Sequence, residues 1–182
     1  VSRAEEFLEQ RKATTVARRT GATTVTGIEG TIAQLRHSAS KARGSAMIVR
    51  LDDSPEAAGF ADRPDVIDIA TRGPLTPDHV IRTKPRAIVV GSDPAADISS
   101  YATAYQAYYE RHKEPGQTML DPAPRWGVWP GVGTVTLGPT AKDAAIAADI
   151  VRHTIRAIQW SESLGGWQAL PEADLFEVEY WD

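Results

Sequence analysis

The fold class is decided by residues 125–159, which read RWGVWPGVGTVTLGPTAKDAAIAADIVRHTIRAIQ. Apolar, β-branched and aromatic residues predict strands over 125–129 and 134–137, joined by a turn at 130–133. Thr140 then predicts the start of a long helix, because the apolar residues after it recur about every 3.6 positions. Two strands followed by a helix that can cover them indicate an α/β domain.

The rest of the chain predicts the same alternation. Apolar runs predict two further strands. Helical periodicity predicts further helices, and several of these have a proline at their first position. The Thr- and Gly-rich residues 20–27 predict a break or a short strand. The expected elements are strands at 46–51 and 86–90, and helices at 1–19, 28–43, 97–114 and after the caps Ser54 and Thr76. The predicted fold is therefore α/β, with a mixed sheet and helices.

Composition excludes several classes of function. With 20 basic against 24 acidic residues the net charge is -4, so no basic surface is available to neutralise the phosphates of nucleic acid. No apolar run is long enough to span a membrane, and the absence of cysteine excludes disulfides and thiolate ligands. These features predict a cytoplasmic protein. The opening residues resemble neither a signal peptide nor an initiation site, so we expect the chain to begin inside a longer protein.

Metal and nicotinamide sites find little support in the spacing of residues. The four histidines, His37, His79, His112 and His153, form no pair with the spacing of metal ligands. A glycine turn with Gly27 and Gly30, followed by Asp52, has part of a dinucleotide pattern but lacks its third glycine. Tyr109 and Lys113 have the spacing of a catalytic Tyr-Lys pair, within a strongly polar stretch rich in tyrosine.

One short segment is dense in ionisable residues. Residues 76–84 contain Asp78, His79, Arg82 and Lys84, and His79 and Arg82 would share one face of a helix. Such a group can bind an anion such as a sugar phosphate, with help from the helix N-terminus. The alternative is a capped surface helix whose charged side chains pair with one another. The sequence leaves both interpretations open and favours the second.

Several stretches together resemble one family, the bacterial enzymes that fuse a class II aldolase to a short-chain dehydrogenase, of the type that degrades rhamnose. The resemblance is strongest to the middle segment of these enzymes and weakest over residues 13–45. The matching stretches are 1–8, 72–84, 119–122, 130–133, 147–150 and 175–181.

The resemblance implies a parent protein with two activities. An aldolase part would use zinc to cleave a ketose 1-phosphate such as rhamnulose 1-phosphate, and a dehydrogenase part would oxidise the aldehyde product with NAD. The resemblance implies that residues 1–45 are a helical lead-in after the aldolase part and that residues 46–182 are a middle domain before the dehydrogenase. It implies no cofactor in this segment. Its partners would be the two flanking domains and, in a homo-oligomer, further copies of the chain.

The order of elements also resembles the second half of a class II aldolase domain. On that resemblance, the His-x-His zinc pair corresponds to Arg50 and Asp52, and the later histidine ligand corresponds to Val132. All three ligands are therefore replaced, which predicts a degenerate aldolase-like module with a non-catalytic scaffold role. The alternative function is a sugar-phosphate-binding or catalytic site around Asp78 and His79, with Arg82 and Lys84 as substrate-binding residues.

Overall fold

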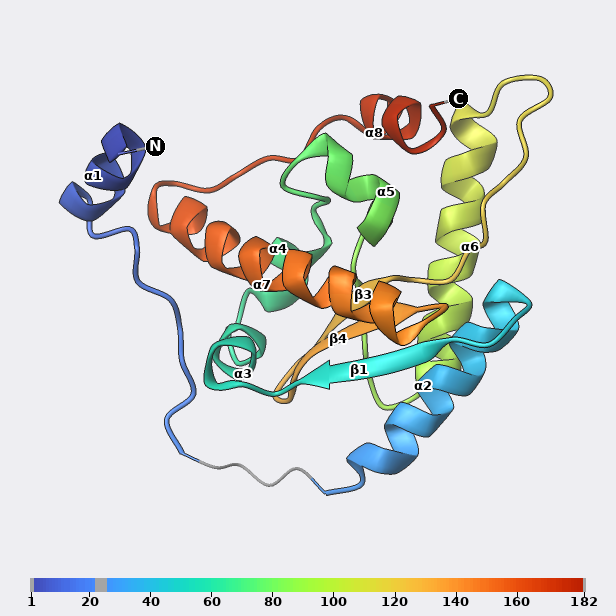
Figure 1. Cartoon of the computed structure of the whole chain (residues 1–182), viewed down its shortest axis with the longest axis horizontal. Helices are drawn as coiled ribbons and strands as arrows, with labels where there is room; N and C mark the ends of the chain where they lie inside the picture. The colour runs from blue at the N-terminus through green and yellow to red at the C-terminus, as the bar shows by residue number, and fades with distance from the viewer. Residues whose placement is uncertain (1, 22–25, 182) are drawn as a thin grey trace.

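The computed structural model describes residues 2–21 and 26–181. Its centre is a four-stranded mixed sheet with the strand order β1-β4-β3-β2 (Figure 1). β1 and β3 both run antiparallel to β4, and β2 runs parallel to β3. The strands are β1 (Ile48–Asp52), β2 (Ile88–Val89), β3 (Trp126–Trp129) and β4 (Gly133–Gly138). The α/β class and the mixed sheet predicted from the sequence are confirmed.

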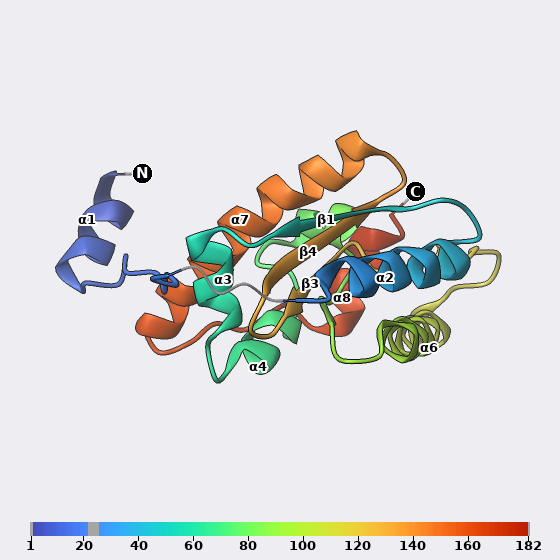
Figure 2. The same ribbon diagram turned by 90° about the horizontal axis from the view of Figure 1, so that it is seen from below.

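Helices cover both faces of this sheet, as the view from below shows (Figure 2). On one face α7 packs along β4 and β1, with two short helices beside it; the opposite face carries two long helices. The first group is α3 (Pro55–Ala61), α4 (Val66–Thr71) and α7 (Ala141–Ser163), and the second is α2 (Ile28–Arg43) and α6 (Pro94–His112). The strand–turn–strand–helix unit of residues 125–159 thus supplies the centre of the fold.

The alternation of side chains along β4 divides the core in two. Val135 and Leu137 belong to the cluster beneath α2 and α6, together with Leu35 and Met47. Thr136 lies on the other side of the strand, where its Oγ1 donates a hydrogen bond of 3.1 Å to the carbonyl oxygen of Ala144 in α7. All six residues of β4 are buried, so neither face of this strand meets water.

The helix starts predicted by side-chain caps form as expected at two positions. The Ser54 hydroxyl accepts from the backbone N–H of Ala57 at 3.4 Å, and that of Thr140 accepts from Asp143 at 3.1 Å. Thr76 is different, because its side chain caps nothing. Residues after it form a single 3-10 turn, η1 (Pro77–His79), and a short helix, α5 (Val80–Thr83).

The helix predicted over residues 1–19 is wrong in length. The observed helix α1 (Ser2–Gln10) ends early, and Lys12 adopts a positive φ of 54° just after it. The Thr-Thr-Val sequence at 14–16 follows, and three β-branched residues in a row disfavour helix. α1 stands away from the rest of the molecule (Figure 1). The break or strand expected at 20–27 falls partly outside the described residues.

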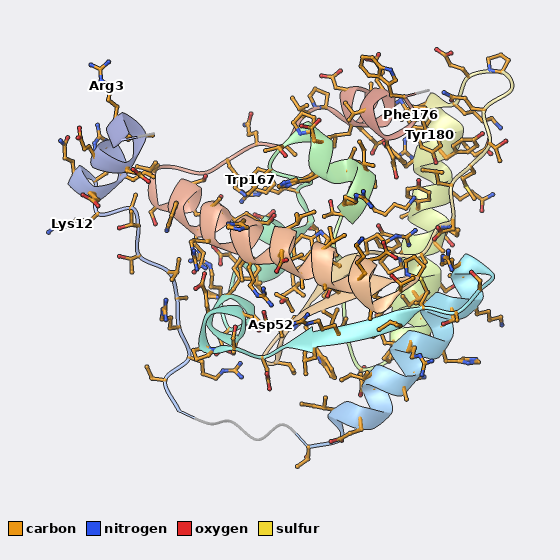
Figure 3. All side chains as sticks on the ribbon, in the orientation of Figure 1. Arg3, Lys12, Asp52, Trp167, Phe176 and Tyr180 are labelled. Carbon is orange, nitrogen blue, oxygen red and sulfur yellow. The ribbon has the colours of Figure 1, made fainter. Side chains whose placement is uncertain are left out.

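The final helix, α8 (Glu172–Glu179), packs against α5 and α6. Phe176 and Tyr180 lie together near the C-terminus (Figure 3), and their rings stack with centroids 4.3 Å apart. Phe176 also meets Tyr108 of α6 edge-on, with centroids 5.4 Å apart. These aromatic residues form a third core cluster, separate from the two beside the sheet. Within residues 2–21 and 26–181, no helix combines the length and the apolar composition that crossing a bilayer requires.

Gly133 is a point where the sheet leaves no room for a side chain. A Cβ at this position would collide with the backbone oxygen of Asp52 on β1. We expect Gly133→Ala to reduce the free energy of unfolding by about 2 kcal/mol or more, because the two strands must separate to fit the methyl group. Gly30 on α2 is the matched control, since a Cβ there meets nothing within 4 Å. Gly30→Ala should stabilise the protein by roughly 0.5–1 kcal/mol through helix propensity. Urea unfolding midpoints measure both, and equal midpoints for Gly133→Ala and the unchanged protein would contradict this packing.

Candidate functional site

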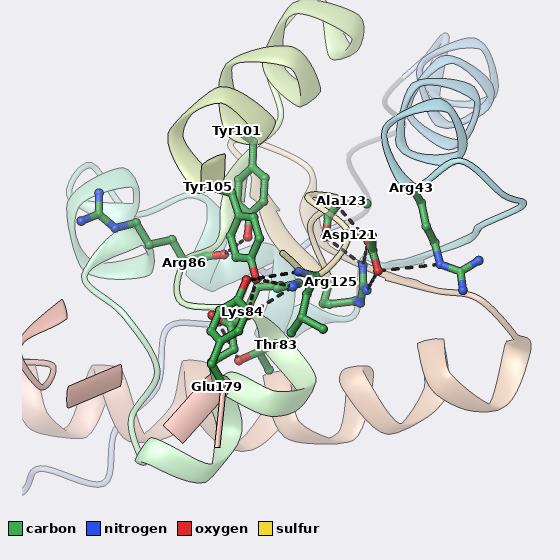
Figure 4. Close-up of polar contacts among 12 residues, drawn as sticks. Arg43, Thr83, Lys84, Arg86, Tyr101, Tyr105, Asp121, Ala123, Arg125 and Glu179 are labelled. Carbon is green, nitrogen blue, oxygen red and sulfur yellow. Dashed lines mark hydrogen bonds and ion pairs between the residues drawn. The ribbon is translucent and has the colours of Figure 1, made fainter. Parts of the chain in front are cut away.

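The most unusual polar group of the molecule is the ammonium of Lys84. The residue is only 5% exposed. Its Nζ donates to the Tyr105 hydroxyl at 2.7 Å and lies 3.2 Å from Oε1 of Glu179 (Figure 4). The ammonium also lies 4.1 Å from the centroid of the Tyr105 ring. A lysine in such surroundings retains its charge only because a carboxylate and a phenol replace the water that burial removes.

The position of Lys84 is fixed by its backbone. It follows α5 and precedes Pro85, and its φ of 64° and ψ of 167° lie in a region that residues other than glycine rarely adopt. Such a conformation costs of order 1–3 kcal/mol and persists only where the surroundings enforce it. Lys84 is held at both its backbone and its side chain, because its N–H donates to the Val80 carbonyl oxygen at 2.9 Å and its Nζ pairs with Glu179 at 3.2 Å.

Glu179 joins three elements. Its Oε1 accepts from the Tyr105 hydroxyl at 2.8 Å, and that hydroxyl lies 2.8 Å from the hydroxyl of Tyr180. The Tyr180 hydroxyl in turn accepts from the backbone N–H of Leu120 at 3.3 Å. The second carboxylate oxygen of Glu179, Oε2, is buried and has no hydrogen-bond partner among the described residues. The network therefore ties α8 to α6, to the end of α5 and to the loop before β3.

Burial controls protonation in this network. It lowers the pKa of Lys84, although the nearby Glu179 carboxylate opposes this effect. It raises the pKa of Tyr105 far above the usual value, and the same carboxylate adds to the rise. The raised pKa favours the protonated Tyr105 hydroxyl, which is the form that donates to Glu179.

A cleft of about 520 Å³ lies next to the network, between α6 and the segment 85–87. Arg86 and Arg111 stand at its edge and both bind Glu172, the first residue of α8, at 3.3 and 2.6 Å. His112 Nε2 lies 2.9 Å from the same carboxylate. Burial would raise the pKa of Glu172, but the hydrogen bonds from Arg111 and His112 outweigh it and lower that pKa.

The side chains of the ionisable segment 76–84 differ in burial. Lys84 points into the buried network, while Asp78 and Arg82 are exposed. Among the described residues, the side chains of Asp78 and Arg82 accept or donate no hydrogen bond and join no ion pair. His79 is half-buried, and its Nδ1 is enclosed without a partner in the described part of the chain. Binding of a sugar phosphate by these four residues stays a prediction.

The three positions that the aldolase resemblance assigns to zinc ligands lie around one corner of the sheet. Arg50 and Asp52 lie on β1, and the backbone at Asp52 contacts Gly133, next to Val132. The Asp52 carboxylate accepts from the backbone N–H of Ser54 at 3.0 Å and pairs with Arg152 of α7 at 3.3 Å. These hydrogen bonds overcome burial and lower the pKa of Asp52. A cation, a salt-bridged carboxylate and an apolar side chain do not fit a zinc ion.

The dinucleotide alternative does not match the geometry. A nucleotide-binding βαβ unit needs parallel neighbouring strands, whereas β1, which ends at Asp52, pairs antiparallel with β4. Tyr109 and Lys113 do not form a catalytic pair, because each side chain contacts a different residue. The Tyr109 hydroxyl donates to the carbonyl oxygen of Gln117 at 2.5 Å, and Lys113 pairs with Glu110 at 2.6 Å. Within the described ranges, no three His, Asp or Glu side chains converge as metal ligands.

Comparison with known proteins supplies the family. Residues 28–182 match the family described as "Aldolase class II, second domain". The chain belongs to this family. An uncharacterized oxidoreductase of Bacillus subtilis (strain 168), YuxG, is 24% identical over 147 residues, which cover 74% of this chain. The match spans 21% of that protein's length, so the chain corresponds to about a fifth of this relative. No solved structure matches the chain.

Most residues of the network in this second domain were missed by the sequence analysis. Lys84 was singled out, but its partners Tyr105 and Glu179 lie 21 and 95 residues away. The tyrosines recurring at three- and four-residue spacing on α6 were the available signal, because a polar helix seldom carries so many rings without burying them. Nothing in the local pattern indicated that Glu179 would be buried.

The ion pair can be tested by removing one charge and then both. We expect Lys84→Met to cost roughly 3–5 kcal/mol of unfolding free energy, because it leaves the Glu179 carboxylate buried without a counter-charge. The double variant Lys84→Met/Glu179→Met should recover much of the loss. Lys142→Met, at an exposed lysine of α7, is the control and should change stability by less than about 0.5 kcal/mol. Additive losses in a denaturant-based double-mutant cycle would show that the two charges do not interact.

The buried tyrosines predict sensitivity to alkali. Burial raises the pKa of Tyr101, Tyr105, Tyr108 and Tyr180. Above about pH 10 the unfolded chain loses these protons while the folded protein keeps them, so stability should fall as the pH rises further. Lys84 acts in the opposite direction because its pKa is lowered, but it is one group against four. Tyrosinate absorbance and circular dichroism should change together in an alkaline titration. Ionisation of most tyrosines before unfolding would contradict the prediction.

Proposed function

We propose that this second domain is a non-catalytic scaffold in a bifunctional enzyme that joins a class II aldolase to a short-chain dehydrogenase. In this proposal the aldolase part cleaves a ketose 1-phosphate of the rhamnulose type with zinc, and the dehydrogenase part oxidises the aldehyde with NAD. What supports the scaffold role is the chemistry of Arg50, Asp52 and Val132 at one corner of the sheet, the positions that the aldolase resemblance assigns to zinc ligands, because this set of side chains does not fit a zinc ion. The Asp52–Arg152 ion pair at that corner joins β1 to α7 and serves stability.

The comparisons support the two-enzyme context. The family is named for class II aldolases, and YuxG, which is much longer than this chain, is called an oxidoreductase. We propose that the partners of this domain are the flanking domains of one chain, that the enzyme forms a homo-oligomer, and that it acts in the cytoplasm. The second candidate function is a sugar-phosphate site around Asp78, His79, Arg82 and Lys84. The half-buried His79, whose Nδ1 has no partner among described residues, favours it.

A thermal-melt panel on the isolated chain separates these two functions. Zinc, NAD and dihydroxyacetone phosphate are added one at a time, and a scaffold predicts no shift with any of them. A ligand at a hundred times its Kd would add about 2.7 kcal/mol, which for this size is a shift of about 5 °C or more. A shift with the phosphate that disappears in His79→Ala/Arg82→Ala would contradict the scaffold and support the second candidate.

The same double variant in the longer enzyme tests the role in catalysis. A scaffold predicts unchanged aldol cleavage and aldehyde oxidation, because the exposed Arg82 side chain joins no ion pair in the described structure. Loss of either activity with an unchanged melting temperature would assign these residues to a functional site. Asp149→Ala on α7 is a surface control, since its carboxylate is largely exposed and pairs only with Arg152 in the described structure.

A further inference from the structure

The cleft beside α6 has the dimensions of a small-molecule site. Its volume of about 520 Å³ falls within the range of roughly 300–1,000 Å³ that is typical of ligand pockets. One wall is a face of α6 and the other is the segment 85–87, which follows the strained Lys84. Both walls are held by the buried network and by the sheet, so the cleft is a fixed feature of the fold.

The interior of the cleft is mainly apolar. Tyr101, Tyr105 and Tyr108 contribute rings, and Ala104 and Ala107 leave space between them on α6. The Tyr101 hydroxyl donates to the carbonyl oxygen of Arg86 at 3.1 Å, which fixes the distance between the two walls. Aromatic rings separated by alanines form a surface onto which a flat or aliphatic group can pack.

The edge of the cleft is positively charged. Arg86 and Arg111 face it with side chains that are 61% and 53% exposed, and Glu172 is the only carboxylate among the described residues that line it. Glu172 accepts from Nη2 of Arg86 and from Nε and Nη2 of Arg111. The remaining guanidinium donors have no acceptor among the described residues. Two cations against one anion leave an excess positive charge and free donors at the mouth of the cleft.

Tyr108 contributes its ring to the cleft. The residue is 3% exposed, and its pKa is raised first by burial and then by the Glu179 carboxylate, whose Oε2 is buried without a hydrogen-bond partner among the described residues. The Tyr108 hydroxyl therefore faces the buried network, and the part of this residue available to a ligand is its aromatic ring.

We propose that this cleft binds a small organic anion whose carboxylate or phosphate accepts from the guanidinium donors of Arg86 and Arg111 that Glu172 leaves free, and whose apolar body packs against the tyrosines of α6. The charged edge supplies the preference for an anion, and the apolar interior requires a carbon body beyond the acidic group. This site is separate from the sugar-phosphate candidate at residues 76–84, and it requires neither the scaffold role nor the two-enzyme context.

The test is titration of the isotope-labelled chain followed by amide chemical shifts. The probes are benzoate and phenyl phosphate, with benzyl alcohol as the uncharged body and inorganic phosphate as the anion without a body. We expect saturable shifts confined to residues 85–87 and 101–111 with one or both aromatic anions, and at least about tenfold weaker binding of the other two probes. The stronger aromatic anion identifies the acidic group as carboxylate or phosphate.

Variants connect the shifts to the cleft. Arg86→Ala and Arg111→Ala should each weaken binding by about tenfold, and Ala104→Leu should abolish it by filling the space while keeping a good helix former. Arg11→Ala is the control, because Arg11 is an exposed arginine that belongs neither to the cleft nor to the segment 76–84, and it should leave the affinity unchanged. Absence of saturable shifts, or a loss of binding in Arg11→Ala in place of Arg86→Ala, would overturn the proposal. Melting curves of each variant show that the fold is retained.

Discussion

The complete burial of β4 is the constraint on which the fold depends. A strand whose two faces are both dry must have a layer of helices on each side, and any polar side chain on it must find a partner. The polar Thr136 side chain finds its hydrogen-bond partner in α7. The apolar Val135 and Leu137 pack in the core cluster under α2 and α6. The helix α2 therefore shares a core with the sheet. The long helices on both faces of the sheet are needed because β4 must be covered on both sides.

The buried Lys84–Glu179 pair holds the region that the sheet does not reach. A buried ion pair adds little net stability relative to a well-packed apolar pair, because desolvation of both charges offsets their attraction. Its effect on specificity is larger. If α8 shifted by one residue, both charges would stay buried without partners, so only one position of α8 is compatible with the fold. The same pair anchors the side chain of Lys84, directly before the segment 85–87 that forms one wall of the cleft.

The sequence predicted what is local and missed what depends on distant contacts. The strands at 125–137 and the helix after Thr140 were correct because periodicity, turn residues and cap are all within one stretch. The helix at 1–19 was overextended because α1 has only one apolar side, whose Phe7 remains 47% exposed, and no packing against the sheet extends it. The charged segment 76–84 was recognised, but its separation into an exposed pair and a buried lysine depends on α8, about 95 residues further along the chain.

The corner formed by β1 and the turn before β4 separates what the backbone requires from what the side chains decide. Gly133 must remain a glycine there, because the strands approach too closely for a side chain, whatever the neighbouring residues do. The side chains of Arg50 and Asp52 are under no such constraint, because both reach solvent. An unpaired carboxylate beside the sheet would cost stability, and Arg152 of α7 removes that cost by pairing with Asp52. Membership of the family rests on the match over residues 28–182, whereas catalysis must be argued from side chains, and the Asp52 side chain forms a structural contact here.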